Sequence, residues 1–231
     1  MLIETSFNET TVGDIVTADF RSAEIFRKAG IDFCCGGKKS LEQACIEKGL
    51  NTASLISALS ELKTSKEHVY NFNEWKLDFL SDYIVNTHHK FVIKSLPELV
   101  FYTAKIANVH GGNHPELIEV ANLFAQIDKE LRQHMQHEED VLFPAIKEIV
   151  QHSTSNKKEI IHAEIERLGA EHDFAGGAMD RINVLTAGYK IPSDACNTYK
   201  VALQLLNQFE DDLHVHVHLE NNILFPKALT L

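Results

Sequence analysis

The chain has 231 residues, of which 44% are hydrophobic, and it carries a formal net charge of −11 at pH 7. This composition suits a protein with a real hydrophobic core, in one large or two modest domains. The acidic balance and the lack of a basic run argue against a nucleic-acid binder, and no apolar run has the length of a membrane span. The N-terminus lacks the pattern of a signal peptide, and the four cysteines show no paired framework, so we expect a cytoplasmic protein with free thiols.

Residues 1–62 are predicted to form a small helical domain. Asp19 is suited to cap a helix that Gly30 ends, and Ser40–Gln43 is a capping box for a helix that stops near Gly49. Helices this short bury little surface by themselves. We therefore expect the domain to pack on something larger or on a second copy of itself.

Two adjacent cysteines, Cys34 and Cys35, lie in a turn between the first helices and are followed by two glycines. The glycines allow a sharp turn that would expose both sulfurs, and Lys38 and Lys39 would favour thiolates. The pair is then a candidate redox, nitrosylation or transient iron site. The alternative is a buried pair of small residues in a tight turn, and the sequence leaves both open. The two remaining cysteines, Cys45 and Cys196, are predicted to be structural.

Residues 63–73 are polar and are predicted to be a linker, and residues 74–231 are predicted to be all helix. Four long segments are separated by breaks near residues 108–114, 151–157 and 188–194, and their apolar residues follow a spacing of three and four. The predicted inward stripes are Val85, His89, Val92 and Leu96; Ile127, Leu131, His134, Glu138, Val141 and Ala145; Ile161, Ile165, Leu168, His172, Ala175, Met179 and Ile182; and Leu206, Phe209, Leu213, His216, Glu220 and Ile223. In every stripe a histidine occupies a position where an apolar residue is expected.

The pattern H-x-x-x-E-x-x-[VI]-L-F-P occurs twice, from His134 and from His216, and matched positions are 82 residues apart (216 − 134 = 82). His89 precedes the first copy by 45 residues (134 − 89) and His172 precedes the second by 44 (216 − 172). The repeat therefore predicts two tandem helix hairpins, which form an up-down four-helix bundle. Each hairpin supplies one histidine from its first helix and a His-x-x-x-Glu from its second.

These six residues are the predicted metal ligands: His89, His134, Glu138, His172, His216 and Glu220. A single histidine on an apolar stripe is usually a hydrogen-bonded core residue, but a buried glutamate is costly unless a cation pairs with it. Six ligands are too many for one tetrahedral zinc, whereas two bridging carboxylates suit two metals with two terminal histidines each. Imidazole with carboxylate and no thiolate fits iron or manganese, and four histidines favour iron.

The remaining histidines are assigned to other positions. His137, His214 and His218 are interpreted as residues at the surface or as residues that contact a metal ligand rather than the metal, because they have no counterpart on a matching stripe. The histidines predicted to be solvated are His88, His110, His114, His152 and His162. Glu130 and Glu171 lie near predicted ligands and are candidates to orient a ligand or relay protons, although a solvated carboxylate is the simpler interpretation of each.

The bundle with these six residues resembles the hemerythrin-like di-iron fold. The segment Asp32–Gly37 resembles the hallmark of the small domain that precedes this bundle in the repair-of-iron-centres (ScdA-type) family, and residues 96–99 and 219–222 are also similar to that family. The resemblance implies a small N-terminal helical domain, a hemerythrin-like bundle with two carboxylate-bridged iron ions, and frequently a homodimer.

The resemblance also implies a function: a cytoplasmic protein that restores iron–sulfur clusters damaged by nitrosative or oxidative stress, with iron supplied from the di-iron centre. Its expected partners are damaged iron–sulfur proteins and small ligands such as nitric oxide or oxygen, with no nucleic acid and no membrane. Two alternatives share the same bundle. One is a di-iron enzyme that reduces nitric oxide or peroxide, and the other is an oxygen or iron sensor without turnover. The Cys34–Gly37 segment favours the repair protein, because a simple carrier has no need of it.

Overall fold

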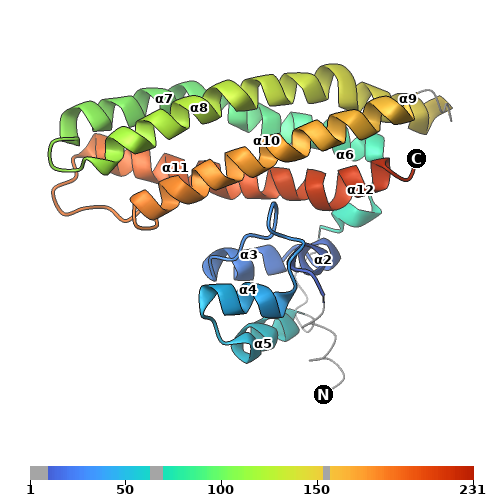
Figure 1. Cartoon of the computed structure of the whole chain (residues 1–231), viewed down its shortest axis with the longest axis horizontal. Coiled ribbons are helices and arrows are strands. Elements are labelled where there is room, and N and C mark those ends of the chain that lie inside the picture. The colour runs from blue at the N-terminus through green and yellow to red at the C-terminus, as the bar shows by residue number, and fades with distance from the viewer. Residues whose placement is uncertain (1–9, 63–69, 153–156) are drawn as a thin grey trace. The chain divides into compact units, whose positions relative to one another are not determined.

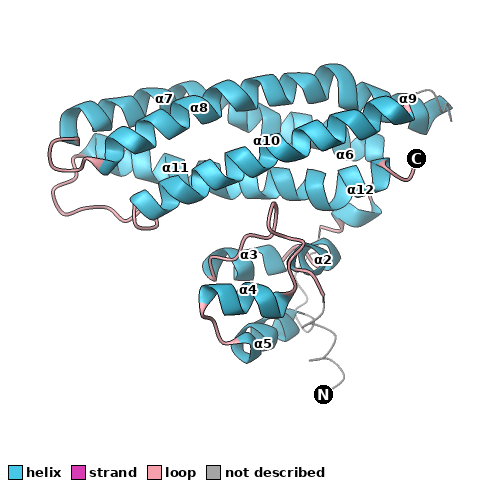
Figure 2. Ribbon diagram, viewed as in Figure 1, coloured by secondary structure: helices cyan, strands magenta, loops and turns pink. Residues whose placement is uncertain are grey.

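The computed structural model describes residues 10–62, 70–152 and 157–231. These residues form helices, turns and loops, with a single isolated β-bridge between Thr11 and Ser40 and no strand (Figure 2). The predicted all-α fold is confirmed. No helix in the described ranges is long and apolar enough to cross a membrane. The described chain divides into two compact units, residues 1–80 with 217–230, and residues 81–216 with 231.

The N-terminal helices of the first unit are α2 (Val12–Ala18), α3 (Ser22–Lys28), α4 (Leu41–Lys48) and α5 (Thr52–Leu62). Ser40 is confirmed as the N-cap of α4, since its Oγ accepts a hydrogen bond from the backbone N–H of Gln43 at 3.2 Å, and Gly49 ends α4 with a φ of 65°. Helix α3 begins at Ser22 rather than directly after Asp19, whose carboxylate binds the side chain of Arg21 instead. Helix α2, whose N-cap is Thr11, was not predicted from the sequence.

The first unit is built from both ends of the chain. Its N-terminal core contains Val12, Phe26, Ile31, Phe33 and Leu41. The C-terminal part of the unit is the end of helix α11 (Asn197–Leu219) from Val217 onward, the π-helical turn η4 (Glu220–Leu224) and α12 (Phe225–Ala228). Helix α2 packs against η4, so the expectation that the small domain needs a further packing partner is confirmed. Residues 1–9 and 63–69, which include most of the predicted linker, lie outside the described residues.

The second unit contains the long helices of the bundle. They are α6 (Leu77–Ile84) from Ser81 onward, η2 (Val85–His89), α7 (Lys90–His110), α8 (Glu116–His137), η3 (Glu138–Leu142), α9 (Phe143–His152), α10 (Lys158–Leu185) and α11 up to His216. Helices α7, α8, α10 and α11 lie along one another in Figure 1, and contacts join α8 to both α7 and α10. The chain turns at residues 111–115 and 186–196 as predicted, whereas residues 153–156 of the third predicted break lie outside the description.

The predicted inward stripes are largely buried. Every stripe residue is less than 9% exposed except Val85, Val141 and Ile165, which are half-buried. Phe124 of α8 packs edge-on against Phe209 of α11, with ring centroids 5.2 Å apart. The spacing of apolar residues therefore identified the correct face of each helix, and the predicted ligands lie on that face.

Three short π-helical turns interrupt the long helices, and the sequence did not predict them. They are η2, η3 and η4. In η3 the N–H of Phe143 donates to the carbonyl of Glu138, and in η4 that of Phe225 donates to Glu220, five residues back in each case. A proline follows each of these phenylalanines and has no N–H to continue the regular helical ladder. The spacing between glutamate and proline that the two copies of the repeat share thus accounts for two of the three π-helical turns, η3 and η4.

Candidate metal centre

All six predicted ligands are buried side chains. Their exposed fractions are 1% for His89, 2% for His134, 0% for Glu138, 1% for His172, 1% for His216 and 0% for Glu220. His89 ends η2, and Glu138 and Glu220 begin η3 and η4, so three of the six lie in π-helical turns, which are common at functional sites. Glu220 follows His216 by one turn of the same continuous helix.

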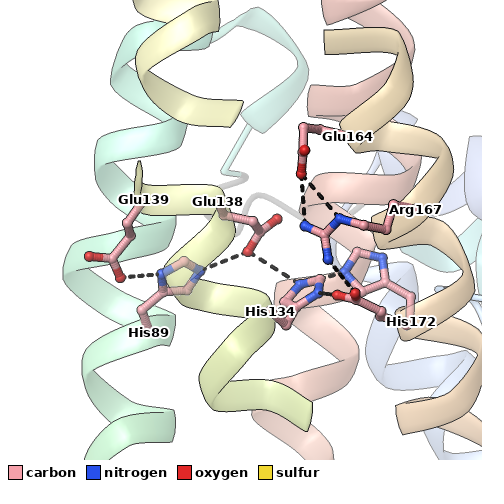
Figure 3. A network of polar contacts seen from close by, with 8 residues as sticks. His89, His134, Glu138, Glu139, Glu164, Arg167 and His172 are labelled. Atoms are coloured by element: carbon pink, nitrogen blue, oxygen red, sulfur yellow. Dashed lines mark hydrogen bonds and ion pairs between the residues drawn. The ribbon is translucent and has the colours of Figure 1, made fainter. Parts of the chain in front are cut away.

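Glu138 lies between two histidines. Its Oε2 atom is 3.3 Å from His89 Nε2 and 3.2 Å from His134 Nε2 (Figure 3). On its other side, His134 Nε2 is 3.0 Å from His172 Nε2. Several lone-pair donors thus converge on one buried region, where a cation offsets the repulsion among them.

The six residues form two overlapping groups of four. One group is His89, Glu138, His216 and Glu220, and the other is His134, Glu138, His172 and Glu220. Within each group the potential ligand atoms all lie within 4.8 Å of one another. The two glutamates belong to both groups, while each group has its own pair of histidines. This donor set of imidazole and carboxylate fits a first-row transition metal.

Carboxylates at the edge of the centre bind the outer nitrogens of two of these histidines. His89 Nδ1 is 2.8 Å from Glu139 Oε1 (Figure 3). His134 Nδ1 is 2.8 Å from Glu171 Oε2. A carboxylate at Nδ1 keeps the proton on that nitrogen and leaves Nε2 with its lone pair directed inward. Such carboxylates are the usual outer partners of metal-binding histidines, so the residues present fit a metal.

Glu171 is therefore not a simple solvated carboxylate. Its hydrogen bond with His134, together with the nearby guanidinium of Arg167, holds the pKa of Glu171 below its usual value. Glu130, the other candidate, lies 3.9 Å from Lys129 and is half-buried. Sequence reasoning missed Glu139, which follows Glu138 directly in the motif. Its partner is 50 residues away, and only the packing of the helices brings the two together.

Two histidines that were predicted to be solvated or at the surface are buried. His88 is 4% exposed, stacks on the ring of His216, and has Nδ1 3.0 Å from Asp212 Oδ1. His218 is fully buried in the first unit, where burial lowers its pKa to about 4. The prediction that His88 is solvated is wrong, and so is the interpretation of His218 as a surface residue, because the outer faces of these helices are themselves covered. His137, His152 and His162 are exposed as expected, while His110, His114 and His214 are half-buried.

The turn of residues 32–37, called the thiol turn below because it holds Cys34 and Cys35, does not expose both sulfurs. Cys34 is 3% exposed and Cys35 is half-buried. The hydrogen bond to Cys35, burial and the Asp32 carboxylate raise the pKa of Cys34 well above its ordinary value, so the predicted thiolate is wrong for Cys34. The carboxylate of Asp32 organises the turn by accepting hydrogen bonds from the backbone N–H groups of Cys34, Cys35 and Gly36.

The end of the last helix closes over this turn within the first unit. The side-chain amide of Asn222 donates to the carbonyl oxygens of Phe33 and Cys34, at 3.3 Å each. His218 Nδ1 lies 3.4 Å from the carbonyl oxygen of Phe33, and the two rings pack edge-on. Residues nearly 190 positions away in the chain thus hold the backbone of this turn.

Cys196 is the most accessible of the thiols and was wrongly predicted to be structural. It is exposed at the start of α11, and its sulfur lies 3.1 Å from His110 Nε2. The hydrogen bond to His110 and the backbone N–H groups of the helix lower the pKa of Cys196 to about 7. Cys45, in contrast, is buried in the N-terminal core as expected.

Comparisons with known proteins agree with this arrangement. Residues 8–63 match the model of ScdA_N, a domain of unknown function, and residues 80–228 match the hemerythrin HHE cation-binding domain. The chain is 35% identical to the iron–sulfur cluster repair protein ScdA of Staphylococcus haemolyticus, over 95% of this chain and 98% of the relative. It belongs to the family of ScdA and YtfE proteins.

Other members of the ScdA and YtfE family are similarly close. The chain is 34% identical to the iron–sulfur cluster repair protein YtfE of Pectobacterium carotovorum, over 97% of this chain and 98% of the relative. It is 35% identical to a probable iron–sulfur cluster repair protein of Haemophilus influenzae, over 97% of this chain and 98% of the relative. The similarity thus extends over nearly the whole length of each relative, and the hemerythrin domain contains all six predicted ligands.

Proposed function

We propose that this family member holds two iron ions, bridged by Glu138 and Glu220. His89 and His216 would be the remaining protein ligands of one ion, and His134 and His172 those of the other. The observation that supports this most strongly is the pair of four-residue groups that share two fully buried glutamates. Two cations offset the charge of these carboxylates, whereas an apolar core gives no reason for them to be there.

We further propose that the centre serves the repair of iron–sulfur clusters damaged by oxidative or nitrosative stress, by supplying iron to the damaged protein. The names of the relatives support repair, and the ligand set supports iron. When bound, the ions supply redox and Lewis-acid chemistry. The protein's own residues orient the ligands, since Glu139 and Glu171 bind the outer nitrogens of His89 and His134.

Metal analysis of protein purified without air tests the proposed centre. We expect two irons per chain, and His172→Ala should lose iron because one ion is left with a single histidine. His162→Ala is the matched control, because His162 lies on the same helix and is exposed. A single zinc per chain with no iron uptake on reconstitution would refute the di-iron proposal.

Iron transfer tests the repair function. The protein is loaded with ⁵⁷Fe and mixed with a [4Fe–4S] protein that nitric oxide has damaged. We expect the label to appear in the restored cluster in proportion to the activity recovered, and the His172→Ala variant should transfer little. Consumption of nitric oxide over many turnovers with all the label retained would instead favour the reductase alternative.

A further inference from the structure

A second cluster of possible ligands lies in the bundle unit, away from the six residues of the metal centre. Asp180 of α10 and Glu210 and His214 of α11 offer ligand atoms that all lie within 4.8 Å of one another. Glu210 and His214 are one helical turn apart and share a face. His214 precedes His216 by two residues, which on a helix turns its side chain by about 200° relative to that ligand.

Glu210 is the buried member of the cluster. It is 6% exposed, and its Oε2 atom accepts a hydrogen bond of 2.9 Å from the side-chain amide of Asn183. A neutral amide does not offset the charge of a buried carboxylate, and burial raises the pKa of Glu210. The carboxylate of Glu210 thus lies buried beside a neutral amide, and Asp180 and His214 supply further ligands for a cation on the same side.

Tyr189 provides an independent indication that something binds here. It is 8% exposed, and its hydroxyl lies near Glu210 and Asn183 but has no hydrogen-bond partner within 3.5 Å among the described residues. Burial, and after it the neighbouring carboxylates of Glu210 and Asp180, raise the pKa of Tyr189. Its backbone is in the left-handed region with a φ of 59°, which is uncommon for a residue other than glycine. A buried hydroxyl directed at a carboxylate cluster usually has a water or ligand as its partner.

We propose that Asp180, Glu210 and His214 form a site for one divalent transition-metal cation, separate from the di-iron centre. Two carboxylates and one imidazole suit zinc, manganese or ferrous iron. Asp180 is exposed and His214 half-buried, so water has access to the remaining coordination positions. The Tyr189 hydroxyl is placed to donate a hydrogen bond to such a water or to a ligand carboxylate.

Zinc binding to the iron-loaded full chain tests this site. Under equilibrium dialysis we expect one additional zinc per chain while the iron content stays constant. Affinity should fall at least tenfold in both Glu210→Gln and His214→Ala, because each removes one of only three protein ligands. His152→Ala is the control, since His152 is exposed and outside the cluster. No additional zinc, zinc that displaces iron, or full zinc binding by both variants would overturn the proposal.

A further pair of variants guards against a folding defect in Glu210→Gln. Asp180 is exposed, so Asp180→Asn should keep the helical circular dichroism of the parent and still lose affinity for zinc. Tyr189→Phe should still bind zinc, with an affinity a few fold lower than that of the parent protein. Anomalous diffraction at the zinc edge must place the metal between α10 and α11, and a peak elsewhere on the protein would refute the assignment.

Discussion

At the scale of single residues, the outer carboxylate partners of His89 and His134 favour the tautomer that leaves the inner nitrogen available to a metal. Glu171 binds His134 Nδ1 at 2.8 Å and is itself paired with Arg167. The variant Glu171→Gln keeps the shape of the side chain and removes the charge that favours the required tautomer. We expect iron affinity to fall by about 10- to 100-fold, as is typical for such outer partners. Competition with a chelator measures the change.

The control for that experiment is Glu130→Gln. Glu130 lies 3.9 Å from Lys129, and such a surface ion pair contributes little. Glu130→Gln should therefore hold iron as the parent protein does. If both variants lose iron equally, general acidity near the centre explains the effect, and the specific contact between Glu171 and His134 does not.

Cys196 should be the fastest thiol to alkylate. Because only the thiolate attacks, and the pKa of Cys196 is lowered to about 7, the rate should rise with pH and reach half its maximum near pH 7. In His110→Ala the hydrogen bond is lost, so the midpoint should move to higher pH. Mass spectrometry after brief treatment with iodoacetamide locates the label. Prior labelling of Cys34, which is 3% exposed, would contradict the burial of the thiol turn.

At the scale of elements, the thiol turn leaves no room for a side chain at Gly37. A Cβ there would lie 2.5 Å from the backbone oxygen of Phe33 and 3.2 Å from Gly13 Cα, and backbone atoms cannot move aside cheaply. Gly37→Ala should destabilise the first unit by about 2 kcal/mol or more, a size typical of overpacking. Urea unfolding followed by tryptophan fluorescence is a suitable readout, because Trp75 belongs to the same unit.

Gly169→Ala is the matched substitution in an open position. Gly169 lies within α10, and nothing stands within 4 Å of the added Cβ. Alanine favours helix over glycine by about 0.5–1 kcal/mol, so this variant should be slightly more stable than the parent. Equal losses of stability in Gly37→Ala and Gly169→Ala would show that the close backbone approach at Gly37 is not the cause.

At the scale of the whole molecule, the first unit depends on both chain ends. Helix α2 packs against η4, and Asn222 holds the thiol turn. A fragment of residues 1–63 lacks these C-terminal partners, and its short helices bury too little surface to fold well alone. We expect weak circular dichroism and poor dispersion of its NMR signals. A cooperative unfolding transition in the fragment would show that the N-terminal helices suffice.

The sequence by itself determined the four long helices, their inward faces and the six candidate ligands. It could do so because a helix repeats every 3.6 residues, and a histidine or glutamate on an apolar stripe is visible in the spacing of its neighbours. The duplication then linked His134 to His216 and Glu138 to Glu220 without knowledge of any contact. The N-cap at Ser40 was equally local, since its partner Gln43 lies three residues away.

Only the tertiary structure decided what covers the other helix faces. The burial of His88 beside Asp212, the contact of Glu139 with His89, and the closure of the thiol turn by Asn222 join residues from 50 to nearly 190 positions apart. The cluster of Asp180, Glu210 and His214 has the same origin, since two helices must meet before it exists. Periodicity reports which face of a helix is apolar, but it does not report which neighbour lies against the remaining faces, because that depends on how the helices pack.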